Sequence, residues 1–445
     1  MHPRSLKKFF FQIQKTITFE GNFKGISIDS RTIQKGDLFF AMDGEKTDGH
    51  KFLDQVEAKG ATAAVVDQRK YKKDSKLALI PVEDVLKCMQ DLSKAEIARR
   101  KKPIIALTGS YGKTTTKEFL KTILEERFKV AASYGNFNSQ IGLCLNVLRQ
   151  NEDLDLWLLE MGMTEKGHIR RLVNIATPDL AIITNIDMAH AKFFDNVQEI
   201  AQAKSEILSH EKTKIGIINK EAKYSEIAQN TGKSQKTLFS LEDPSADFYL
   251  KKNNKNFSIF EKGQLAFEGE INVQGAYNQQ NFLAACAAAR SFGMQWEEIC
   301  QAKDKLRLPE KRFECYQMGQ VSVIDDCYNA SPAAFEKILE ELPVNRPGKK
   351  IGVFGQMLEL GKFSEQAHRS LGKKALEHID LLFCFGKDCR YVVEEWKNAG
   401  KTAYLFDEHV ILADRLNASL SPGDLVLFKG SRGCQLEKVI ALMKT

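Results

Sequence analysis

Short apolar runs recur along the chain and alternate with longer segments of mixed polarity. Four of them lie in the middle of the sequence: PIIAL (103–107), DLWLLEMG (155–162), DLAIITNI (179–186) and KIGIIN (214–219). Their nearly continuous hydrophobic character is typical of parallel strands that are covered on both faces of a sheet. The intervening segments are long enough for helices, so the pattern predicts a parallel α/β sheet.

The alternation returns after Arg312. The runs VSVIDD, KIGVFGQM, DLLFCFG, TAYLFD and DLVLFKG are each followed by a helical segment, which predicts another α/β domain of the dinucleotide-fold, or Rossmann-like, kind. Between the two alternating regions, residues 236–274 are more polar and carry shorter strands. The alanine-rich segment 278–292 is apolar on almost every side, so it predicts a buried helix.

The first hundred residues predict a small α/β unit. Strands are expected around Ile26, at 38–41 and at 63–66, followed by a helix over 85–97. A chain of 445 residues with 43% hydrophobic residues is too long for one ordinary core. We therefore expect an α/β protein with three domains, at residues 1–100, 101–312 and 313–445.

Composition narrows the class of protein. No apolar run approaches the roughly 18 residues of a membrane span, and the basic N-terminus with FFF at 9–11 lacks a long apolar segment and a cleavage site. We expect a cytoplasmic protein. Nine cysteines without a CxxC pair fit isolated thiols better than disulfides or a zinc site. The net charge of +7 is spread along the chain, which suits anionic small molecules and gives little support to nucleic-acid binding.

The segment LTGSYGKTTTKEF (107–119) carries the clearest chemistry. It joins an apolar strand to a helix through a turn with glycines at 109 and 112, and such a turn points its N–H groups and the positive end of a helix dipole at phosphate. Lys113 is expected on the β/γ-phosphates and the Thr114 hydroxyl on Mg²⁺. The form is TGxxGKT, because the first glycine of the full Walker spacing is replaced by Leu107.

Three further polar residues follow the central strands, where open α/β sheets place their ligands. Glu160 ends DLWLLE, His190 follows TNI, and Lys204 lies in AQAKSEI. Each has a simpler explanation: Glu160 as a solvated carboxylate, His190 as a turn cap, and Lys204 as a surface residue. Beside a phosphate-binding turn, however, a nucleotide–Mg²⁺ site needs carboxylate and further oxygen or imidazole ligands.

Several motifs together resemble the Mur ligases. They are GSYGKTTTKEF, GNFNSQIG, LLEMG, NIDMAH with AKSEI, LPEKRFE, DDCYNASP, GQMLELG and KGSR. MLELG followed by His368, and the ending KGSR, resemble the MurF type, while the DNPR signature of the MurE type is missing. The resemblance implies an ATP-dependent, ADP-forming ligase that adds D-alanyl-D-alanine to UDP-N-acetylmuramoyl-tripeptide through an acyl phosphate. The N-terminal domain would bind the UDP end, the central domain ATP, and the C-terminal domain D-Ala-D-Ala.

The resemblance also assigns the catalytic and metal-binding residues. Thr114 and Glu160 would hold one Mg²⁺, and His190 and Lys204 would serve a second. Lys204 matches a lysine that the family carries as a carbamate, which offers anionic oxygens of the kind Mg²⁺ prefers. The implied catalytic set is Lys113, Glu160, His190, Lys204 and Arg312.

The nucleotide and substrate contacts follow in the same way. The implied nucleotide-binding residues are Gly109, Ser110, Tyr111, Gly112, Lys113, Thr114, Thr115, Asn278, Asn281, Arg312, Asp326 and Asn329. The implied substrate-binding residues are Ser30 and Arg31 for uridine, Asn136 and Asn138 for the sugar and pyrophosphate, and His368, Lys429, Ser431 and Arg432 for the dipeptide. Tyr277 replaces a common histidine, Ser139 an asparagine, and Gln356 the aspartate of GDMLELG.

Two alternatives stay open at this point. One is another ligase of the superfamily that adds a single amino acid, such as a MurE-like enzyme, or a MurC-like or folylpolyglutamate-type ligase. The other is a silent nucleotide-binding partner, which would be expected to lack Lys113, Glu160, His190 or Lys204. We expect a monomer, and nothing in the sequence identifies the third residue of the acceptor tripeptide.

Overall fold

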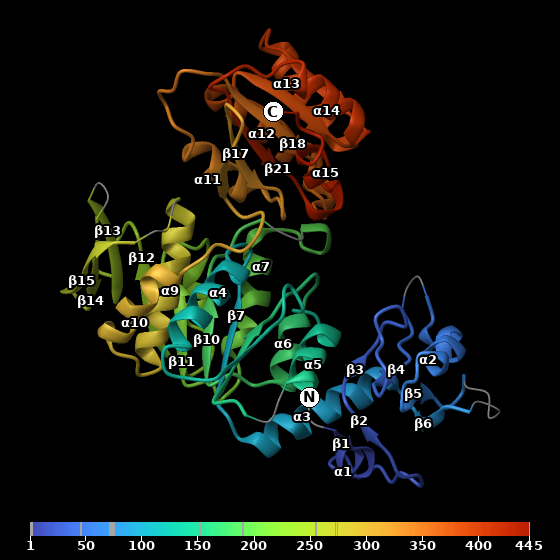
Figure 1. Ribbon diagram of the computed structural model, residues 1–445. Helices are drawn as coiled ribbons and strands as arrows, with labels where there is room; N and C mark the ends of the chain where they lie inside the picture. Colours follow the sequence, from blue (N-terminus) through green and yellow to red (C-terminus); the bar gives the residue numbers. More distant parts are fainter. Residues whose placement is uncertain are drawn as a thin grey trace.

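The structure is a computed structural model that describes residues 3–44, 47–70, 76–150, 153–188, 191–253, 256–271, 273 and 275–444. These residues form three α/β parts, with the C-terminal part above the central one and the N-terminal part beside it (Figure 1). The predicted α/β class with parallel sheets is confirmed. Among the described helices, none is long and apolar enough to cross a membrane.

The N-terminal part contains a four-stranded parallel sheet in the order β3-β4-β5-β6, and a separate antiparallel pair, β1 and β2. The helix α3 leads to the central part. It begins after Asp84, whose side chain accepts the Lys87 N–H, and it ends at Lys101 in the left-handed conformation. The elements are β1 (Arg4–Ser5), α1 (Leu6–Phe11), β2 (Asn22–Phe23), β3 (Ile26–Ser27), β4 (Leu38–Phe40), η1 (Gly49–Phe52), α2 (Leu53–Ala58), β5 (Ala63–Asp67), β6 (Ala78–Val82) and α3 (Val85–Arg100).

The central part is built on a nine-stranded sheet in the order β15-β14-β13-β12-β11-β10-β7-β9-β8. All pairs are parallel except β13–β14 and β14–β15 at one edge. Its strands are β7 (Ile104–Thr108), β8 (Val130–Ala132), β9 (Leu156–Glu160), β10 (Leu180–Ile183), β11 (Ile215–Asn219), β12 (Gln235–Ser240), β13 (Phe248–Asn253), β14 (Asn256–Glu261) and β15 (Gln264–Glu270). Its helices are α4 (Lys113–Leu124), α5 (Gln140–Arg149), α6 (His168–Ile175), η2 (Ala191–Phe193), α7 (Val197–Ser205), η3 (Glu206–Leu208), α8 (Ser225–Gln229), α9 (Ala276–Ser291), α10 (Trp296–Ala302) and η4 (Lys303–Lys305).

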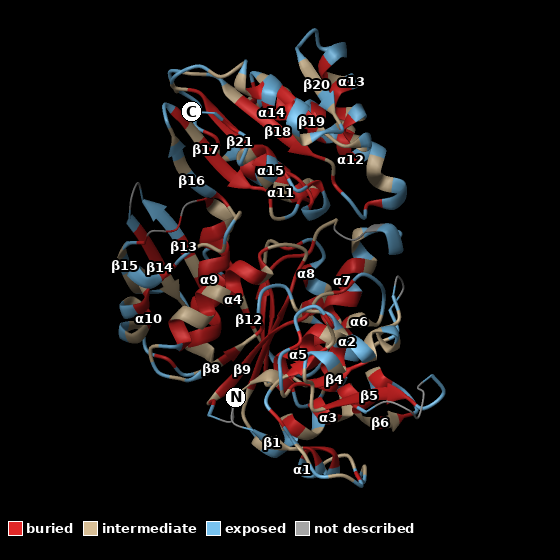
Figure 2. Cartoon of the chain, turned by 45° about the vertical axis from the view of Figure 1, so that its right-hand side comes forward, coloured by how far each residue is buried: buried red, intermediate tan, exposed pale blue. Residues whose placement is uncertain are grey.

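The strands in the middle of this sheet are apolar because helices cover both of its faces. On β7, Ile104 and Ala106 belong to a core that is shared with α3, α5 and α6 and continues into the N-terminal part. Ile105 and Leu107 point to the other face, where α4 and α9 pack. All five residues of β7 are buried, so no polar alternation is visible in the sequence of this strand. Figure 2 shows the buried strands in the interior of the two larger parts.

The C-terminal part contains a six-stranded sheet in the order β16-β17-β21-β18-β19-β20, parallel except for β16. The chain order reverses between β18 and β21, which is the position where Rossmann-like sheets bind ligands. Its strands are β16 (Glu314–Met318), β17 (Val321–Asp326), β18 (Lys350–Gly355), β19 (Leu381–Phe385), β20 (Ala403–Phe406) and β21 (Leu425–Lys429). Its helices are α11 (Pro332–Glu340), η5 (Gly361–Phe363), α12 (Ser364–His378), η6 (Lys387–Cys389), α13 (Arg390–Asn398), α14 (His409–Asn417), η7 (Arg432–Cys434) and α15 (Glu437–Ile440).

Candidate active site

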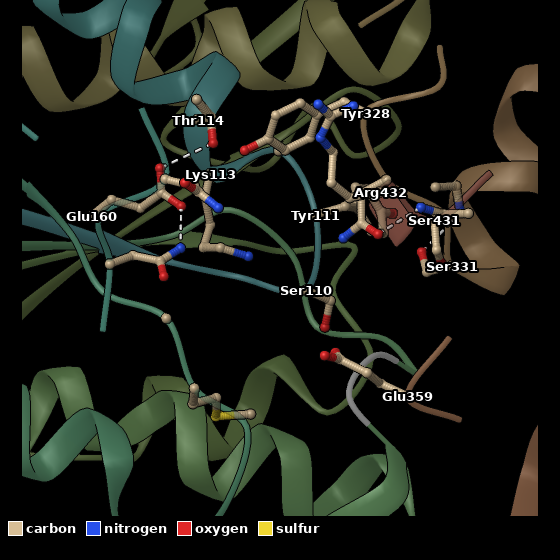
Figure 3. A pocket seen from close by; sticks show the side chains of 18 of the residues that line it. Ser110, Tyr111, Lys113, Thr114, Glu160, Tyr328, Ser331, Glu359, Ser431 and Arg432 are labelled. Carbon is tan, nitrogen blue, oxygen red and sulfur yellow. Dashed lines mark hydrogen bonds between the residues drawn. The ribbon is translucent and has the colours of Figure 1, made fainter. Parts of the chain in front are cut away.

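A cavity of about 580 Å³ lies between the central and C-terminal parts. This volume lies in the range of sites for small molecules and cofactors. The cavity is lined on one side by the turn after β7 and by Glu160 at the end of β9, and on the other by segments that follow β17, β18 and β21. Figure 3 shows Lys113, Thr114 and Glu160 on one side, with Ser431 and Arg432 opposite.

The turn from Thr108 to Lys113 needs both of its glycines. Gly112 has φ +82°, and a Cβ there would lie 2.2 Å from Asn281 Oδ1. A Cβ on Gly109 would lie 2.0 Å from Thr184 Oγ1. The turn therefore fits tightly against β10 and α9, and α4 begins at Lys113 without a side-chain cap. Its first N–H groups are available to an anion.

Lys113 extends back along this turn. Its ammonium donates to the Gly109 carbonyl oxygen at 2.8 Å. Burial lowers the pKa of Lys113, an effect that Glu160 opposes and the positive charge of Arg312 reinforces. An anionic phosphate in the turn would oppose this shift and favour the charged form, so the position suits the role predicted for this lysine.

Glu160 is the centre of a hydrogen-bonded group at the end of β9. Thr114 Oγ1 donates to Glu160 Oε2 at 3.0 Å, and Asn138 Nδ2 donates to Glu160 Oε1 at 2.8 Å (Figure 3). The Arg312 guanidinium donates to Thr114 Oγ1 at 3.2 Å. A hydroxyl and a carboxylate oxygen held this close beside a phosphate-binding turn are ligands of the type that Mg²⁺ prefers.

Lys204 is buried on α7, with 1% of its surface exposed, and does not line the cavity. Burial and the neighbouring positive charge of Lys113 lower the pKa of Lys204 well below its ordinary value. No hydrogen bond or ion pair to its amine occurs among the described residues. His190 lies outside the described residues, so its predicted metal role stays a prediction. Three residues before His190, the chain is bonded to the phosphate-binding turn: Ser110 Oγ donates to the Asp187 carbonyl oxygen at 2.7 Å.

The cavity wall near α9 carries polar atoms that the described residues leave unpaired. They are the Tyr277 hydroxyl, Asn281 Nδ2 and Arg312 Nε. The Arg312 guanidinium lies 4.2 Å from the centre of the Tyr328 ring. Because an unpaired buried polar group is costly, these atoms are well placed for a ligand. Asn278 is buried but does not line the cavity, unlike its predicted partner Asn281.

Asp326 and Lys429 are neighbours on β17 and β21 and form a buried ion pair. The Lys429 ammonium also donates to the Asn329 carbonyl oxygen at 3.3 Å. The charge of Lys429 is therefore balanced within the protein. Arg432 pairs with Glu437 but keeps half of its side chain exposed at the cavity wall, and both cations line the cavity.

His368 does not line the cavity. Its ring is fully buried, with Nδ1 2.7 Å from the Ser364 carbonyl oxygen and Nε2 accepting the Met357 N–H at 3.0 Å. Burial lowers the pKa of His368. The ring thus supports the segment 357–360, of which Leu358, Glu359 and Leu360 line the cavity. Its predicted contact with substrate stays a prediction.

The departures from the family pattern have local explanations. Ser139 caps α5 by accepting the Gly142 N–H at 3.2 Å. Gln356 accepts the Asp388 N–H at 3.1 Å and does not line the cavity. Tyr277 packs edge-on against Phe313, with ring centres 5.7 Å apart.

The residues predicted to hold uridine lie on the N-terminal part, apart from the cavity lining. Arg31 forms a two-point ion pair with Asp29. Hydrogen bonds from Arg31 lower the pKa of Asp29 to about 2. The Lys59 ammonium donates to the Ser30 carbonyl oxygen at 2.9 Å. Of the predicted sugar-binding residues, Asn136 and Asn138 both line the cavity.

Sequence reasoning missed several cavity residues. Tyr328, Ser331 and the segment 358–360 lie inside DDCYNASP and GQMLELG, so these motifs contained the signal. Met163 and His168 also line the cavity, and no sequence pattern pointed to them. Within the described part of the chain, no three His, Cys, Asp or Glu side chains converge as a metal cluster.

Three family descriptions match the chain in order. Residues 22–99 match the "Mur ligase family, catalytic domain", residues 107–289 the "Mur ligase middle domain", and residues 311–432 the "Mur ligase, glutamate ligase domain". The UDP-N-acetylmuramoyl-tripeptide--D-alanyl-D-alanine ligase of Bacillus subtilis (strain 168) is 32% identical over 429 residues, which cover 94% of this chain and 92% of the relative.

Two solved structures are similar over nearly the whole chain. The MurF structure of Acinetobacter baumannii has a TM-score of 0.87 at 28% identity and covers 99% of this chain and 98% of its own. The MurF ligase of Thermotoga maritima, in complex with ADP, has a TM-score of 0.81 at 27% identity and covers 94% of this chain and 96% of its own. The matched domains, the curated relative and the site geometry agree: the chain belongs to the Mur ligase family, and within it to the MurF ligases.

Proposed function

We propose that this chain joins D-alanyl-D-alanine to UDP-N-acetylmuramoyl-tripeptide with hydrolysis of ATP to ADP, the step that completes the UDP-MurNAc-pentapeptide of peptidoglycan synthesis. The observation that carries the proposal is the composition of one cavity. The phosphate-binding turn, the Thr114–Glu160 oxygen pair and residues from the switch point of the C-terminal sheet all line it. Its curated relative in Bacillus subtilis is named for these substrates.

The chemistry requires an activated carboxylate, because a carboxylate does not react with an amine at neutral pH. The peptide carboxylate attacks the γ-phosphorus of ATP, the bond to the β,γ-bridging oxygen breaks, ADP leaves, and the carboxylate becomes an acyl phosphate. The dipeptide amine then attacks the carbonyl carbon and expels phosphate. The protein's task is positioning and neutralisation of negative charge. Lys113 binds the β/γ-phosphates, and Arg312 reaches the same region from the segment between the two larger parts.

The oxygens of Thr114 and Glu160 fit a magnesium ion, which would neutralise phosphate charge when bound. A second ion would be held by His190 and Lys204. The amine of Lys204 is buried, its pKa is lowered, and it has no hydrogen bond to any residue that the structure describes. These features support the proposal of a carbamate, since only a neutral amine captures carbon dioxide. Asn138 and Arg312 keep the Glu160 carboxylate and the Thr114 hydroxyl oriented toward each other.

The C-terminal part would select the dipeptide. Both cations are paired, but Arg432 is the more available one for a terminal carboxylate, because half of its side chain is exposed, whereas Lys429 is buried with Asp326. A carboxylate one residue beyond the reacting amine could reach Arg432, whereas that of a single alanine would lie too close to the amine. We place this reaction in the cytoplasm, carried out by a monomer. The alternative is a MurE-like enzyme that adds a single amino acid.

Phosphate release from ATP tests the proposal directly. With UDP-MurNAc-tripeptide present, release should depend on D-Ala-D-Ala, and mass spectrometry should find the pentapeptide product. Discrimination against D-Ala, lysine and diaminopimelate should exceed the roughly 10- to 200-fold that one small apolar group supplies, because a charge contact is lost as well. Comparable kcat/KM with lysine or diaminopimelate would instead assign the chain a MurE-like activity.

A further inference from the structure

A fully buried lysine lies next to the phosphate-binding turn, outside the cavity lining. Lys117, on α4, has no exposed surface, and its ammonium donates to the carbonyl oxygens of Ser133 at 2.6 Å and Gly135 at 3.0 Å. The Glu118 carboxylate lies 2.9 Å from the same nitrogen. All three N–H groups of the ammonium therefore face an acceptor, as a charge removed from water requires.

The two carbonyl acceptors of Lys117 belong to residues 133–138, which we call the SYGNFN loop. This loop has no helix or strand of its own. Its first residue, Ser133, accepts the Glu160 N–H at 3.0 Å, and its last, Asn138, donates to the Glu160 carboxylate at 2.8 Å. The loop thus connects the charge of Lys117 to the carboxylate at the centre of the site.

A second side chain holds the loop from α5. Asn146 Oδ1 accepts the Tyr134 N–H at 2.9 Å, and Asn146 Nδ2 donates to the Phe137 carbonyl oxygen at 2.8 Å. Between the Lys117 and Asn146 contacts, the loop turns Asn136 and Asn138 toward the cavity. The main chain of the loop is also bonded to β9 and to the segment after it: the Ser133 N–H donates to the Leu158 carbonyl oxygen, and the Gly162 N–H donates to the Asn138 carbonyl oxygen, both at 2.9 Å. Of the side chains Lys117 and Asn146, only Lys117 lies on the helix that begins at the phosphate-binding turn.

We propose that Lys117 is a positioning residue that fixes the SYGNFN loop relative to the nucleotide helix α4. Through the loop it sets the position of Asn136, Asn138 and the Glu160 carboxylate, and so aligns the UDP-sugar-peptide with the γ-phosphate. The inference deepens the proposed function and rests on it. Lys117 itself touches neither substrate nor nucleotide.

Lys117→Met tests the inference, because methionine keeps the buried stem and removes the charge and the donors. Lys121→Met is the matched control: Lys121 lies one turn further on α4, partly exposed and 3.7 Å from Glu125. Lys117→Gln, which retains one short donor, is the milder variant if the methionine protein does not fold. Each is measured by hydrogen–deuterium exchange without ligands, by calorimetry with ADP and with UDP-MurNAc-tripeptide, and by steady-state ligation.

We expect exchange in residues 133–138 to rise by at least about tenfold in Lys117→Met, with the strands β7, β10 and β11 unchanged. The KM and the dissociation constant for the UDP-peptide should rise by about tenfold, while ADP affinity changes by less than about twofold. Lys117→Gln should show the same split to a smaller degree, and Lys121→Met none.

A rise in exchange throughout the central sheet, or an equal loss of ADP and UDP-peptide binding, would show that Lys117 only supports the fold. Unchanged exchange in the loop would also overturn the inference. Exchange needs no substrate, so its result is independent of the proposed function. Failure of the wild-type protein to bind the UDP-peptide or to ligate would instead reject that function.

Discussion

Glu160 shows how single residues of this site are fixed by several parts of the chain. Its N–H, and each of its two carboxylate oxygens, is bonded to a different side chain, from the loop before α5 or from α4. Because hydrogen bonds to a carboxylate are roughly twice as strong as neutral ones, the side chain has little freedom to rotate. A fixed carboxylate next to Lys113 is the arrangement that phosphoryl transfer needs.

Lys113→Ala should leave the fold intact and reduce ligation strongly. The substitution removes the charge that we propose to face the β/γ-phosphates, and loss of one such group typically costs about 10² to 10³ in rate. Steady-state ligation and thermal unfolding, with exposed Lys212→Ala as the control, measure both effects. A variant that kept more than about a tenth of the normal rate would contradict the role given to Lys113.

Lys204→Ala should abolish activity, and acetate or formate should restore part of it by occupying the space of the carbamate. Burial and the positive charge of Lys113 lower the pKa of Lys204 well below its ordinary value, which favours the neutral amine, and protonation as the pH falls would prevent carbamate formation. A carbamate signal in ¹³C NMR spectra of the wild-type protein with labelled bicarbonate, absent from the variant, is the direct measurement. No signal together with no rescue would count against the carbamate.

At the scale of elements, the segment 357–360 depends on α12. Its Met357 N–H is bound by His368, its Leu358 N–H by Ser431 Oγ, and its Glu359 carbonyl by the Lys192 N–H of the central part. Glu359 itself has φ +64°, which is uncommon outside glycine. Because this backbone conformation is unfavourable for a residue with a side chain, the contacts around the segment must hold it in place.

His368→Leu should lower the free energy of unfolding by about 1–3 kcal/mol, because it leaves the Met357 N–H buried and unpaired. In the wild-type protein, burial lowers the His368 pKa from 6.5, although the Ser364 carbonyl and Asp388 oppose the shift. The folded state then binds fewer protons than the unfolded one. Stability is full above pH 6.5 and falls as the pH drops below it, by at most about 1.4 kcal/mol per pH unit.

Denaturant unfolding between pH 5 and pH 8 measures this slope. The slope should be smaller in His368→Leu and unchanged in the control His210→Leu, which alters the central part. Equal slopes in wild type and His368→Leu would refute the structural role of a neutral His368.

The inner strands of the two large sheets, such as β7, β9 and β21, were predictable because all of their residues are buried, so each reads as a nearly continuous apolar run. The phosphate-binding turn was also predictable, since Gly109 and Gly112 are needed where the backbone passes close to Thr184 and Asn281. The Asp326–Lys429 pair was not. This pair forms only because β21, a strand late in the sequence, lies beside β17 in the sheet. The order of strands in a sheet cannot be predicted from the local sequence pattern of each strand. The role of His368 was likewise not predictable, because it depends on the Met357 N–H, which tertiary packing brings next to the imidazole ring.

At the scale of the molecule, polar contacts join the central part to the C-terminal part and to the linking segment around Arg312. They include the ion pair between Lys362 and Asp195 and three hydrogen bonds around the cavity. The Arg312 guanidinium donates to Thr114, the Lys192 N–H donates to the Glu359 carbonyl, and the Ala276 N–H donates to Glu341 Oε1 at 2.6 Å. The third contact places a carboxylate of the C-terminal part on the N-terminus of α9, where a negative charge is favourable. Because ligands would touch both parts, their binding and this arrangement should favour each other.

Glu341→Ala should therefore shift the free protein toward more open arrangements. Loss of a charged helix cap costs about 1–2 kcal/mol, which changes the ratio of closed to open molecules by about 5- to 30-fold.

Small-angle X-ray scattering should show a larger radius of gyration for the ligand-free variant than for wild type. Glu340→Ala is the control, since Glu340 ends α11 directly before Glu341 and forms ion pairs with Lys337 and Lys374, both of the C-terminal part. ATP and the UDP-peptide together should bring wild type and variant to the same compact radius, because ligand contacts replace the missing cap. If Glu341→Ala and Glu340→Ala gave the same radius with and without ligands, the contact at α9 would have no part in holding the two larger parts together. Closure would then have to depend on the remaining contacts, which include Arg312, the 357–360 segment and the Lys362–Asp195 ion pair.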